Sequence, residues 1–125
     1  MRALIIRHGR AGRREPWNPD DPQRHLTNEG VLQAELLVEE FGDLSFTALY
    51  SSPYARCIET LEPLAARCGL EIKIDERLSE STTYSAIDSF MLSLDPQGII
   101  ATCSHGNVVP AIVEKLVGRQ VQYLP

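Results

Sequence analysis

The hydrophobic residues of this chain form short runs that alternate with longer segments of mixed polarity. Four short runs are dominated by aliphatic and β-branched residues, which is typical of strands. A short apolar run bounded by glycine fits a strand buried on both faces of a sheet, and we expect this of the first and the last run. The expected strands are Ala3–Ile6, Phe46–Tyr50, Glu71–Ile74 and Ile99–Cys103.

Between and after these runs, apolar residues recur at helical spacing. In the first such segment they are Val31, Leu32, Ala34, Leu36, Leu37, Val38 and Phe41. The expected helices run from the N-cap Thr27 to Gly42, from Ser52 to Cys68, from Ala86 to Leu94, and from Asn107 to Val117 with Gly118 after it. In the second helix Ser52 suits the N-cap and Pro53 the first helical position, while Pro63 is expected to kink or divide it.

Strands that alternate with helices predict an α/β fold, here a three-layer α/β/α sandwich around a mainly parallel sheet. Neither an internal repeat nor a linker interrupts the pattern, so residues 1–125 are expected to form a single domain. The last seven residues show no clear element. In open sheets of this kind, ligands bind at the carboxyl ends of the strands.

Charge and composition limit the kinds of molecule that this chain is expected to bind. A net charge of −5 disfavours nucleic acid and anionic membranes, which usually require a basic excess. No apolar run reaches the length of a membrane span, and the first residues enter a strand pattern without a leader, so we expect a cytoplasmic protein. Three cysteines, Cys57, Cys68 and Cys103, form no CxxC pair, and we interpret them as small buried hydrophobic residues.

A polar stretch over residues 10–25 has neither helical nor strand periodicity and contains three prolines. A loop of this length within a compact domain is more often functional than not. The loop carries Arg10, Arg13, Arg14 and Arg24, and we expect the first three of them to be solvated.

Two of the expected strands end in matching chemistry. The first is followed by His8 and Gly9 after Arg7, and the last by Ser104, His105 and Gly106. Arg56 lies in the first turn of a helix, where the helix dipole favours anions over cations. Cations and imidazoles are costly to gather unless an anion lies among them, so these residues together predict a phosphate site.

Three other chemistries fit less well. A metal site has only His8, His25 and His105 to draw on, and the arginines beside them would repel a dication. A cysteine phosphatase needs an arginine six residues after its thiolate, but Val109 stands there relative to Cys103. A serine hydrolase lacks its GxSxG turn.

Phosphoryl transfer through a histidine therefore fits best, because a neutral imidazole is nucleophilic at pH 7 and arginines can hold the phosphoryl oxygens. The leaving oxygen then requires a proton from a nearby carboxylic acid. Glu80 is the preferred candidate for this acid, with Asp75 and Glu76 as alternatives on the same loop.

Four motifs carry a family resemblance. They are RHG (Arg7–Gly9), RxLTxxG (Arg24–Gly30), SSPYARCIET (Ser51–Thr60) and SHG (Ser104–Gly106). In this order they resemble the histidine phosphatase superfamily, also called the phosphoglycerate mutase-like fold. The chain is most similar to the short SixA-type phosphohistidine phosphatases and to the histidine phosphatase domain that some bacterial Nudix hydrolases carry.

The resemblance implies a role for each matching residue. His8 would be the phosphorylated nucleophile, His105 would donate to the phosphoryl group, and Glu80 would match the acid of the mutase-like branch. The phosphate-binding residues that it implies are Arg7, Gly9, Arg24 and Arg56. No cofactor and no metal are implied.

The resemblance also implies a phosphorylated substrate, which could be a phosphoprotein, a nucleotide or a small phosphate ester. The segment from Asp75 to Gly98 is shorter than the insertions that roof the mutase site, so an open site is expected. A phosphoglycerate mutase or a non-catalytic phosphate-binding module are the alternative functions. The chain ends at Pro125, so it is either a minimal or a shortened member. The sequence carries no signal for an oligomeric state.

Overall fold

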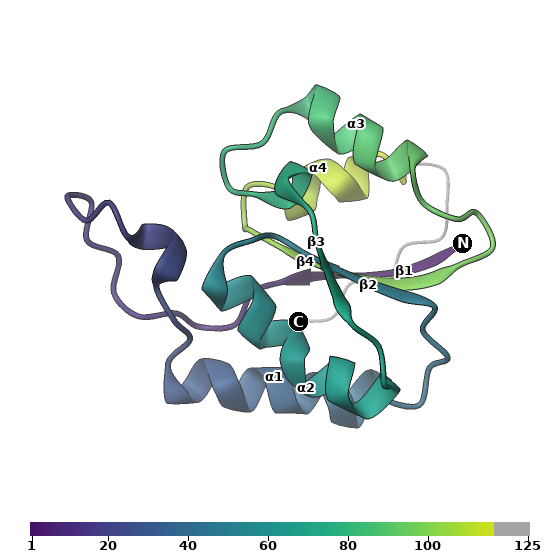
Figure 1. The fold of residues 1–125 in the computed structure, drawn as a ribbon, viewed down its shortest axis with the longest axis horizontal. Helices are drawn as coiled ribbons and strands as arrows, with labels where there is room; N and C mark the ends of the chain where they lie inside the picture. Colours follow the sequence, from purple (N-terminus) through teal and green to yellow (C-terminus); the bar gives the residue numbers. More distant parts are fainter. Residues whose placement is uncertain (117–125) are drawn as a thin grey trace.

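The structure, a computed structural model, describes residues 1–116 (Figure 1). Strands, helices and two short 3-10 helices alternate along this part of the chain. In order they are β1 (Arg2–Arg7), η1 (Asp21–Gln23), α1 (Asn28–Phe41), β2 (Ala48–Ser51), α2 (Ala55–Cys68), β3 (Ile72–Ile74), η2 (Glu76–Leu78), α3 (Tyr84–Leu92), β4 (Ile99–Ser104) and α4 (Val109–Glu114).

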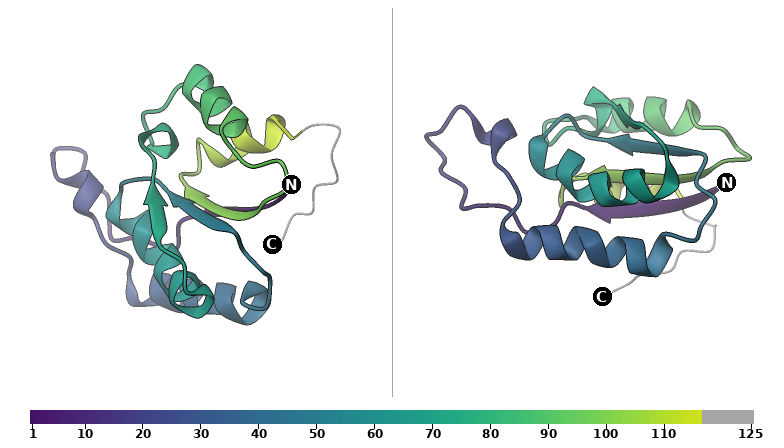
Figure 2. Two further views of the ribbon diagram at one scale, coloured as in Figure 1. Left: turned by 45° about the vertical axis from the view of Figure 1, so that its right-hand side comes forward. Right: turned by 60° about the horizontal axis from the view of Figure 1, so that its bottom comes forward.

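The four strands form one parallel sheet in the order β1-β4-β2-β3. Helices α3 and α4 cover one face of the sheet and α1 and α2 the other, which confirms the predicted α/β/α sandwich (Figures 1 and 2). The register pairs Arg7 with Ser104 and Ser51 with Cys103, so the carboxyl ends of β1, β4 and β2 lie side by side at one end of the sheet. The long loop after β1 projects beyond this end (Figure 2).

Each face of the sheet has its own hydrophobic core. Under α3 and α4 the buried side chains include Leu78, Ile87, Phe90, Ile100 and Ile112. Under α1 and α2 they include Leu49, Leu61, Leu64, Ala101 and Cys103, and Cys57 is buried with them. The interpretation of Cys57 and Cys103 as small buried residues is confirmed, whereas Cys68 is only partly buried.

Burial differs from expectation in two elements. β4 is buried on both faces as predicted, but β1 lies at an edge of the sheet and only its Ile6 is fully buried. Helix α1 buries Ala34, whereas Leu32 and Leu36 are 60% and 55% exposed. The predicted apolar face of α1 is therefore wider than the face that meets the core.

Helix starts were predicted with mixed success. Thr27 is the N-cap of α1, and its hydroxyl accepts a hydrogen bond from the Gly30 amide, as expected. The prediction for Ser52 is wrong, because α2 begins at Ala55 and the Ser52 hydroxyl contacts a histidine instead. α2 continues through Pro63 as one helix and so is not divided there.

The last helix is also shifted. α4 starts at Val109 with Val108 as its cap, so the prediction that Asn107 is the N-cap is wrong. The Asn107 side chain donates to the Glu80 carbonyl instead. The predicted end of this helix, Val117 with Gly118, and the seven residues after it lie outside the described residues.

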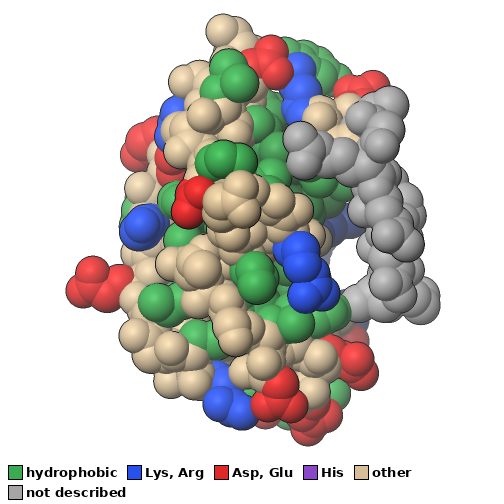
Figure 3. All heavy atoms as spheres, turned by 90° about the vertical axis from the view of Figure 1, so that its right-hand side faces the viewer, with side chains coloured by type: hydrophobic (Ala, Val, Ile, Leu, Met, Phe, Trp, Pro, Cys, Tyr) green, Lys and Arg blue, Asp and Glu red, His purple; other side chains and the backbone are tan. Residues whose placement is uncertain are grey.

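The end of the molecule away from the long loop carries scattered charges. In Figure 3, lysine and arginine side chains stand singly among hydrophobic and acidic ones on this face. Within residues 1–116, no helix combines the length and the hydrophobicity that a bilayer crossing demands.

Candidate active site

A cavity of about 700 Å³ lies at the carboxyl ends of the strands. Several of its lining residues are exposed, so it opens to solvent as predicted. The lining residues are Arg7, His8, Gly9, Arg10, Ala11, Arg14, Arg24, Gln33, Glu80, His105, Gly106 and Asn107. The two predicted strand-end histidines thus meet in one cavity, together with four arginines.

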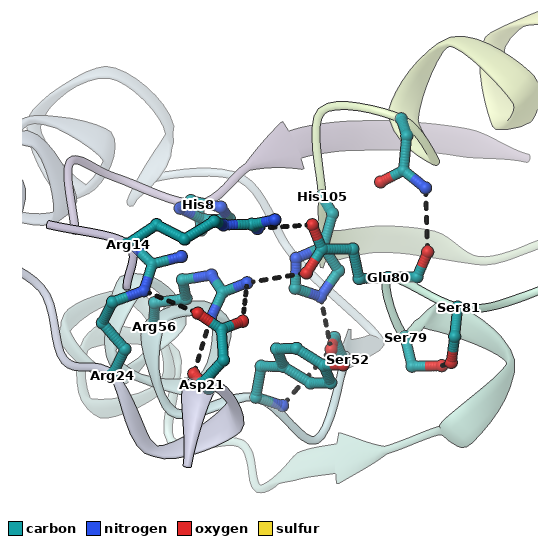
Figure 4. A network of polar contacts seen from close by, with 12 residues as sticks. His8, Arg14, Asp21, Arg24, Ser52, Arg56, Ser79, Glu80, Ser81 and His105 are labelled. Carbon is teal, nitrogen blue, oxygen red and sulfur yellow. Dashed lines mark hydrogen bonds and ion pairs between the residues drawn. The ribbon is translucent and has the colours of Figure 1, made fainter. Parts of the chain in front are cut away.

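His8 follows β1, is half-buried and lines this cavity, with Arg14 and His105 nearby (Figure 4). Its Nδ1 donates to the carbonyl of Gly9 at 2.8 Å, which leaves the lone pair on Nε2. Burial lowers the pKa of His8, although the bond to Gly9 partly opposes that shift, so the ring is neutral at pH 7. The Gly9 amide donates to the Thr60 hydroxyl at 3.0 Å and fixes this turn against α2.

His105 is fully buried beside His8, with ring centroids 5.5 Å apart and planes at 68°. Its Nε2 lies 2.8 Å from the Ser52 hydroxyl (Figure 4). That hydroxyl accepts from the Tyr54 amide, and the Cys57 Sγ lies 3.7 Å from the same Nε2. When the Ser52 hydroxyl donates to Nε2, the proton of His105 sits on Nδ1, a buried atom with no partner among residues 1–116. Such a ring can donate one hydrogen bond to an anion in the cavity.

Arg7 reaches the cavity across Gly106. A Cβ atom at position 106 would come within 2.9 Å of the Arg7 Cζ, closer than real Cβ contacts allow. The guanidinium of Arg7 thus lies directly over Gly106, and a larger residue there would displace this flexible side chain. The RHG motif thus supplies Arg7, and the SHG motif supplies the glycine against which its guanidinium lies.

Arg56 lies behind the cavity and does not line it. Its side chain is fully buried, and it donates to Asp21 Oδ2 at 3.3 Å and to Glu80 Oε2 at 3.0 Å (Figure 4). A third bond goes to the Asp21 carbonyl, while its Nε has no partner among the described residues. In the structure, the anionic partners of Arg56 are the carboxylates of Asp21 and Glu80. The predicted binding of a phosphate by Arg56 therefore stays a prediction.

Arg24 does line the cavity, and its position depends on the same aspartate. Its Nε donates to Asp21 Oδ1 at 2.9 Å and its Nη1 to the Gly12 carbonyl. Burial alone would raise the pKa of Asp21, but the hydrogen bond from Arg24 and the charge of Arg56 outweigh it and lower that pKa. Asp21 is thus an anion that holds two arginines in place.

Glu80 lies at the mouth of the cavity between two arginines. Arg14 Nη2 donates to its Oε1 at 2.6 Å, and Arg56 to its Oε2. Partial burial would raise the pKa of Glu80, but the hydrogen bond and the charge of Arg14, with the charge of Arg56, lower it. Of the alternatives for the acid, Asp75 pairs with Arg77 and neither it nor Glu76 lines the cavity.

Several residues of the site were not predicted from the sequence. Arg10 and Arg14 are exposed as expected, but both also line the cavity, which was not predicted. Ser52 and Asn107 were interpreted as helix caps, and Asp21 was not singled out. The unusual length of the polar loop was the one sequence signal for Arg14 and Asp21, because it pointed to function without indicating which side chains turn inward.

The donor set suits an anion. Four arginines line the cavity and a fifth, Arg56, lies directly behind it, against the two carboxylates Asp21 and Glu80. Guanidinium groups match phosphate oxygens in charge and in geometry. Within residues 1–116 no three His, Cys, Asp or Glu side chains are grouped as a metal site would require.

Comparison with known proteins identifies the family. The family model described as histidine phosphatase superfamily (branch 1) matches residues 3–87. The chain belongs to this superfamily, as its motifs indicated.

Relatives and solved structures agree with this assignment. The 8-oxo-(d)GTP phosphatase of Mycolicibacterium smegmatis is 34% identical over 115 residues, which are 89% of this chain and 36% of that protein. The chain thus spans about a third of the length of this relative.

Two solved structures share the fold. The protein histidine phosphatase SixA complexed with tungstate is similar at a TM-score of 0.78 and 21% identity, over 100% of this chain and 83% of that one. A mycobacterial glucosyl-3-phosphoglycerate phosphatase bound to VO3 is similar at a TM-score of 0.68 and 19% identity, over 94% of this chain and 80% of that one. The fold is therefore phosphoglycerate mutase-like, as predicted.

Proposed function

We propose that this chain is a phosphatase that hydrolyses phosphoric monoesters or phosphohistidine through a covalent phosphohistidine on His8. The observation that carries the proposal is the state of His8. Its ring is neutral, its Nδ1 is committed to the Gly9 carbonyl, and its Nε2 keeps a lone pair in a cavity lined by arginines. A nucleophile in this state needs no separate base to remove a proton first.

In the first step, His8 Nε2 forms a bond to phosphorus while the bond from phosphorus to the leaving oxygen breaks. Arg7 and Arg24 hold the non-bridging oxygens, with Arg56 behind them, and His105 donates from Nδ1. Glu80, once protonated, gives its proton to the leaving oxygen. With a monoester, the products of this step are an alcohol and a phosphoryl group on His8. With phosphohistidine, the bond that breaks is from phosphorus to nitrogen, and the leaving group is the substrate's imidazole.

In the second step, water attacks the phosphorus and the bond to His8 Nε2 breaks. The Glu80 carboxylate left by the first step accepts the proton of the attacking water, so the acid is restored together with the free imidazole. Inorganic phosphate then leaves. The same carboxyl group serves both steps because it faces the same side of the cavity as the leaving oxygen and the incoming water.

Relatives support a phosphorylated substrate without fixing its identity. The names of the similar proteins refer to a nucleotide phosphatase, a protein histidine phosphatase and a phosphatase of a sugar derivative. All three act on a phosphoryl group, and the cavity here opens to solvent and is wide enough to admit a bulky substrate. We therefore propose phosphoproteins, nucleotides and small phosphate esters as the substrate classes to compare.

A substrate screen with the wild type and His8→Ala tests the proposal. We expect hydrolysis of at least one substrate class by the wild type and its loss, by a factor of roughly 10⁴ or more, in His8→Ala. His25→Ala is a matched control, because this histidine is exposed and pairs with Glu59 outside the cavity. Hydrolysis that persists in His8→Ala would contradict the proposal. Isomer exchange between added phosphoglycerates would indicate a mutase instead.

A further inference from the structure

Apart from Arg7, the arginines of the site fall into an inner and an outer group. Arg56 and Arg24 are the inner ones, since their side chains are 0% and 18% exposed and both are bonded to Asp21. Arg14 and Arg10 are the outer ones, with side chains that are 54% and 66% exposed. All but Arg56 line the same cavity. The inner group is fixed, whereas the outer group can change partners.

The partner of Arg14 matters because it is Glu80. Charged and titratable groups face this carboxyl from several elements: Arg14 from the loop after β1, Arg56 from α2 and His105 from the end of β4, with Asp21 sharing Arg56. Two cations bonded to one carboxylate favour its ionised form. An ionised Glu80 cannot protonate a leaving oxygen, so the proposed chemistry requires that one of these contacts be released.

Arg14 is the contact that can be released. Its ion pair lies at the surface, where such pairs contribute little to stability and can be exchanged for another anion. Arg56 is fully buried and is also bonded to the Asp21 carbonyl and carboxylate. Arg14 lies between β1 and η1, after the points at which Ala11 pairs with Leu26 and the Gly12 amide donates to the His25 carbonyl. None of the described backbone bonds involves Arg14 itself, so its movement breaks none of them.

We propose that Arg14 is a specificity-determining residue that selects substrates with a second anionic group next to the reacting phosphate. Such a group is the second phosphate of a nucleoside diphosphate or triphosphate, or a carboxylate beside a phosphate ester. It attracts Arg14 away from Glu80, and Glu80 then takes up a proton from solvent and passes it to the leaving oxygen. This inference rests on the proposed phosphatase function and adds a substrate class to it.

A substrate with one anionic group leaves the contact between Arg14 and Glu80 in place. Its leaving oxygen then meets a carboxylate that carries no proton, and the first step is slow. Discrimination therefore acts on the chemical step as well as on binding. Arg10, whose partner Glu29 is 59% exposed, lies further out in the same cavity and can follow a longer chain of phosphates.

The test compares two substrates that differ in one group. Phosphoglycolate carries a carboxylate where 2-hydroxyethyl phosphate carries a hydroxymethyl group. We expect the wild type to have a kcat/KM at least about tenfold higher for phosphoglycolate, and Arg14→Met to bring the ratio close to one. In Arg14→Met, hydrolysis of 2-hydroxyethyl phosphate should also extend to higher pH, because Glu80 then stays protonated to higher pH.

Arg13→Met is the matched control, since Arg13 is exposed on the same loop and does not line the cavity. It should keep the wild-type ratio of the two substrates. An equal ratio in the wild type and in Arg14→Met would overturn the proposal, as would an unchanged pH profile.

A second measurement separates failure of this inference from failure of the proposed function. The Glu80 carboxyl is titrated by carbon-13 NMR in His8→Ala, which binds ligands without turnover, with Glu80→Gln for assignment. Saturating phosphoglycolate should raise the pKa of Glu80 further than saturating 2-hydroxyethyl phosphate does, and Arg14→Met should remove the difference. Equal titration curves with the two ligands would overturn the role of Arg14, even if no substrate is ever turned over.

Discussion

At the scale of single residues, the site depends on how two histidine rings are oriented. His8 and His105 are chemically alike, yet one ring is bonded to a carbonyl and the other to a hydroxyl. In the proposed mechanism, the Gly9 carbonyl leaves a lone pair on His8 Nε2, and the Ser52 hydroxyl, as donor to Nε2, leaves a proton on His105 Nδ1. The proposal therefore assigns attack to the first ring and donation to the second.

Removal of the Ser52 hydroxyl tests whether this group sets the tautomer of His105. In Ser52→Ala the His105 ring loses the bond that fixes its tautomer, so we expect kcat to fall on the order of tenfold with little change in KM. The measurement is steady-state kinetics across pH. Ser51→Ala is the control, because Ser51 is equally buried but its hydroxyl donates to the Ser52 carbonyl. Equal losses in both variants would show that Ser52 acts through packing alone.

At the scale of elements, the loop after β1 is held against the start of α1 by two glycines. A Cβ at Gly30 would lie 2.1 Å from the Arg10 carbonyl oxygen, and one at Gly9 would lie 2.8 Å from the Gly30 carbonyl oxygen. The Arg10 carbonyl also accepts from the Thr27 amide. This close approach determines where the arginine-bearing loop leaves the sheet, and so where its side chains meet the cavity.

Gly30→Ala should therefore move the loop. Although alanine favours helix, the overlap with the Arg10 carbonyl should cost about 1–3 kcal/mol of unfolding free energy and lower kcat/KM as the loop shifts. Urea denaturation measures the first effect and kinetics the second. Gly12→Ala lies on the same loop with no atom closer than 3.8 Å, so its stability should change by less than about 0.5 kcal/mol. A Gly30→Ala as stable as the wild type would contradict this account.

Some features of these elements were accessible from the sequence and others were not. The convergence of His8 and His105 was predictable because each strand is visible as an apolar run and parallel strands end at one edge. The order of the strands was not predictable, since Ala3–Ile6 looks as apolar as Ile99–Cys103, although β1 is an outer strand and β4 an inner one. The local pattern of apolar residues indicates whether side chains are buried. It does not indicate which strands lie on either side of a given strand.

Side-chain partners across the fold were the least predictable part of the site. Ser52 has the local sequence of a helix cap, and the contact with His105 arises from a residue 53 positions away. Arg14 reaches Glu80 across 66 positions. Both bonds depend on tertiary geometry that no short spacing encodes, whereas the cap of Thr27 on Gly30 is local and was predicted correctly.

At the scale of the whole molecule, paired carboxylates connect stability to pH. Asp21, Asp75 and Glu80 are each bonded to arginines, which lower their pKa values in the folded chain. A carboxyl group with a lowered pKa adds stability above its unfolded pKa, and this contribution is lost as the pH falls through the folded value.

The lowered pKa of His8 should make the urea midpoint decline slightly between pH 7 and about pH 5, because the unfolded chain takes up this proton first. The carboxyl groups should make it fall more steeply below about pH 4, where carboxyl groups of unfolded chains titrate. Asp75→Asn removes one such pair outside the cavity, that with Arg77, and should flatten part of the fall. Urea denaturation at several pH values measures the midpoint of the wild type and of Asp75→Asn. A midpoint that rises on acidification would contradict the assignment of these ion pairs.

The central claim is the phosphohistidine on His8, and rapid acid-free quenching of the enzyme with a radiolabelled substrate tests it most directly. We expect a labelled phosphate that is stable in base and labile in acid, that peptide mapping locates on His8, and that is absent from His8→Ala. His105→Ala should slow the formation of this phosphohistidine, and the label should still be found on His8. Turnover without any label on His8, or label found on His105, would contradict the account.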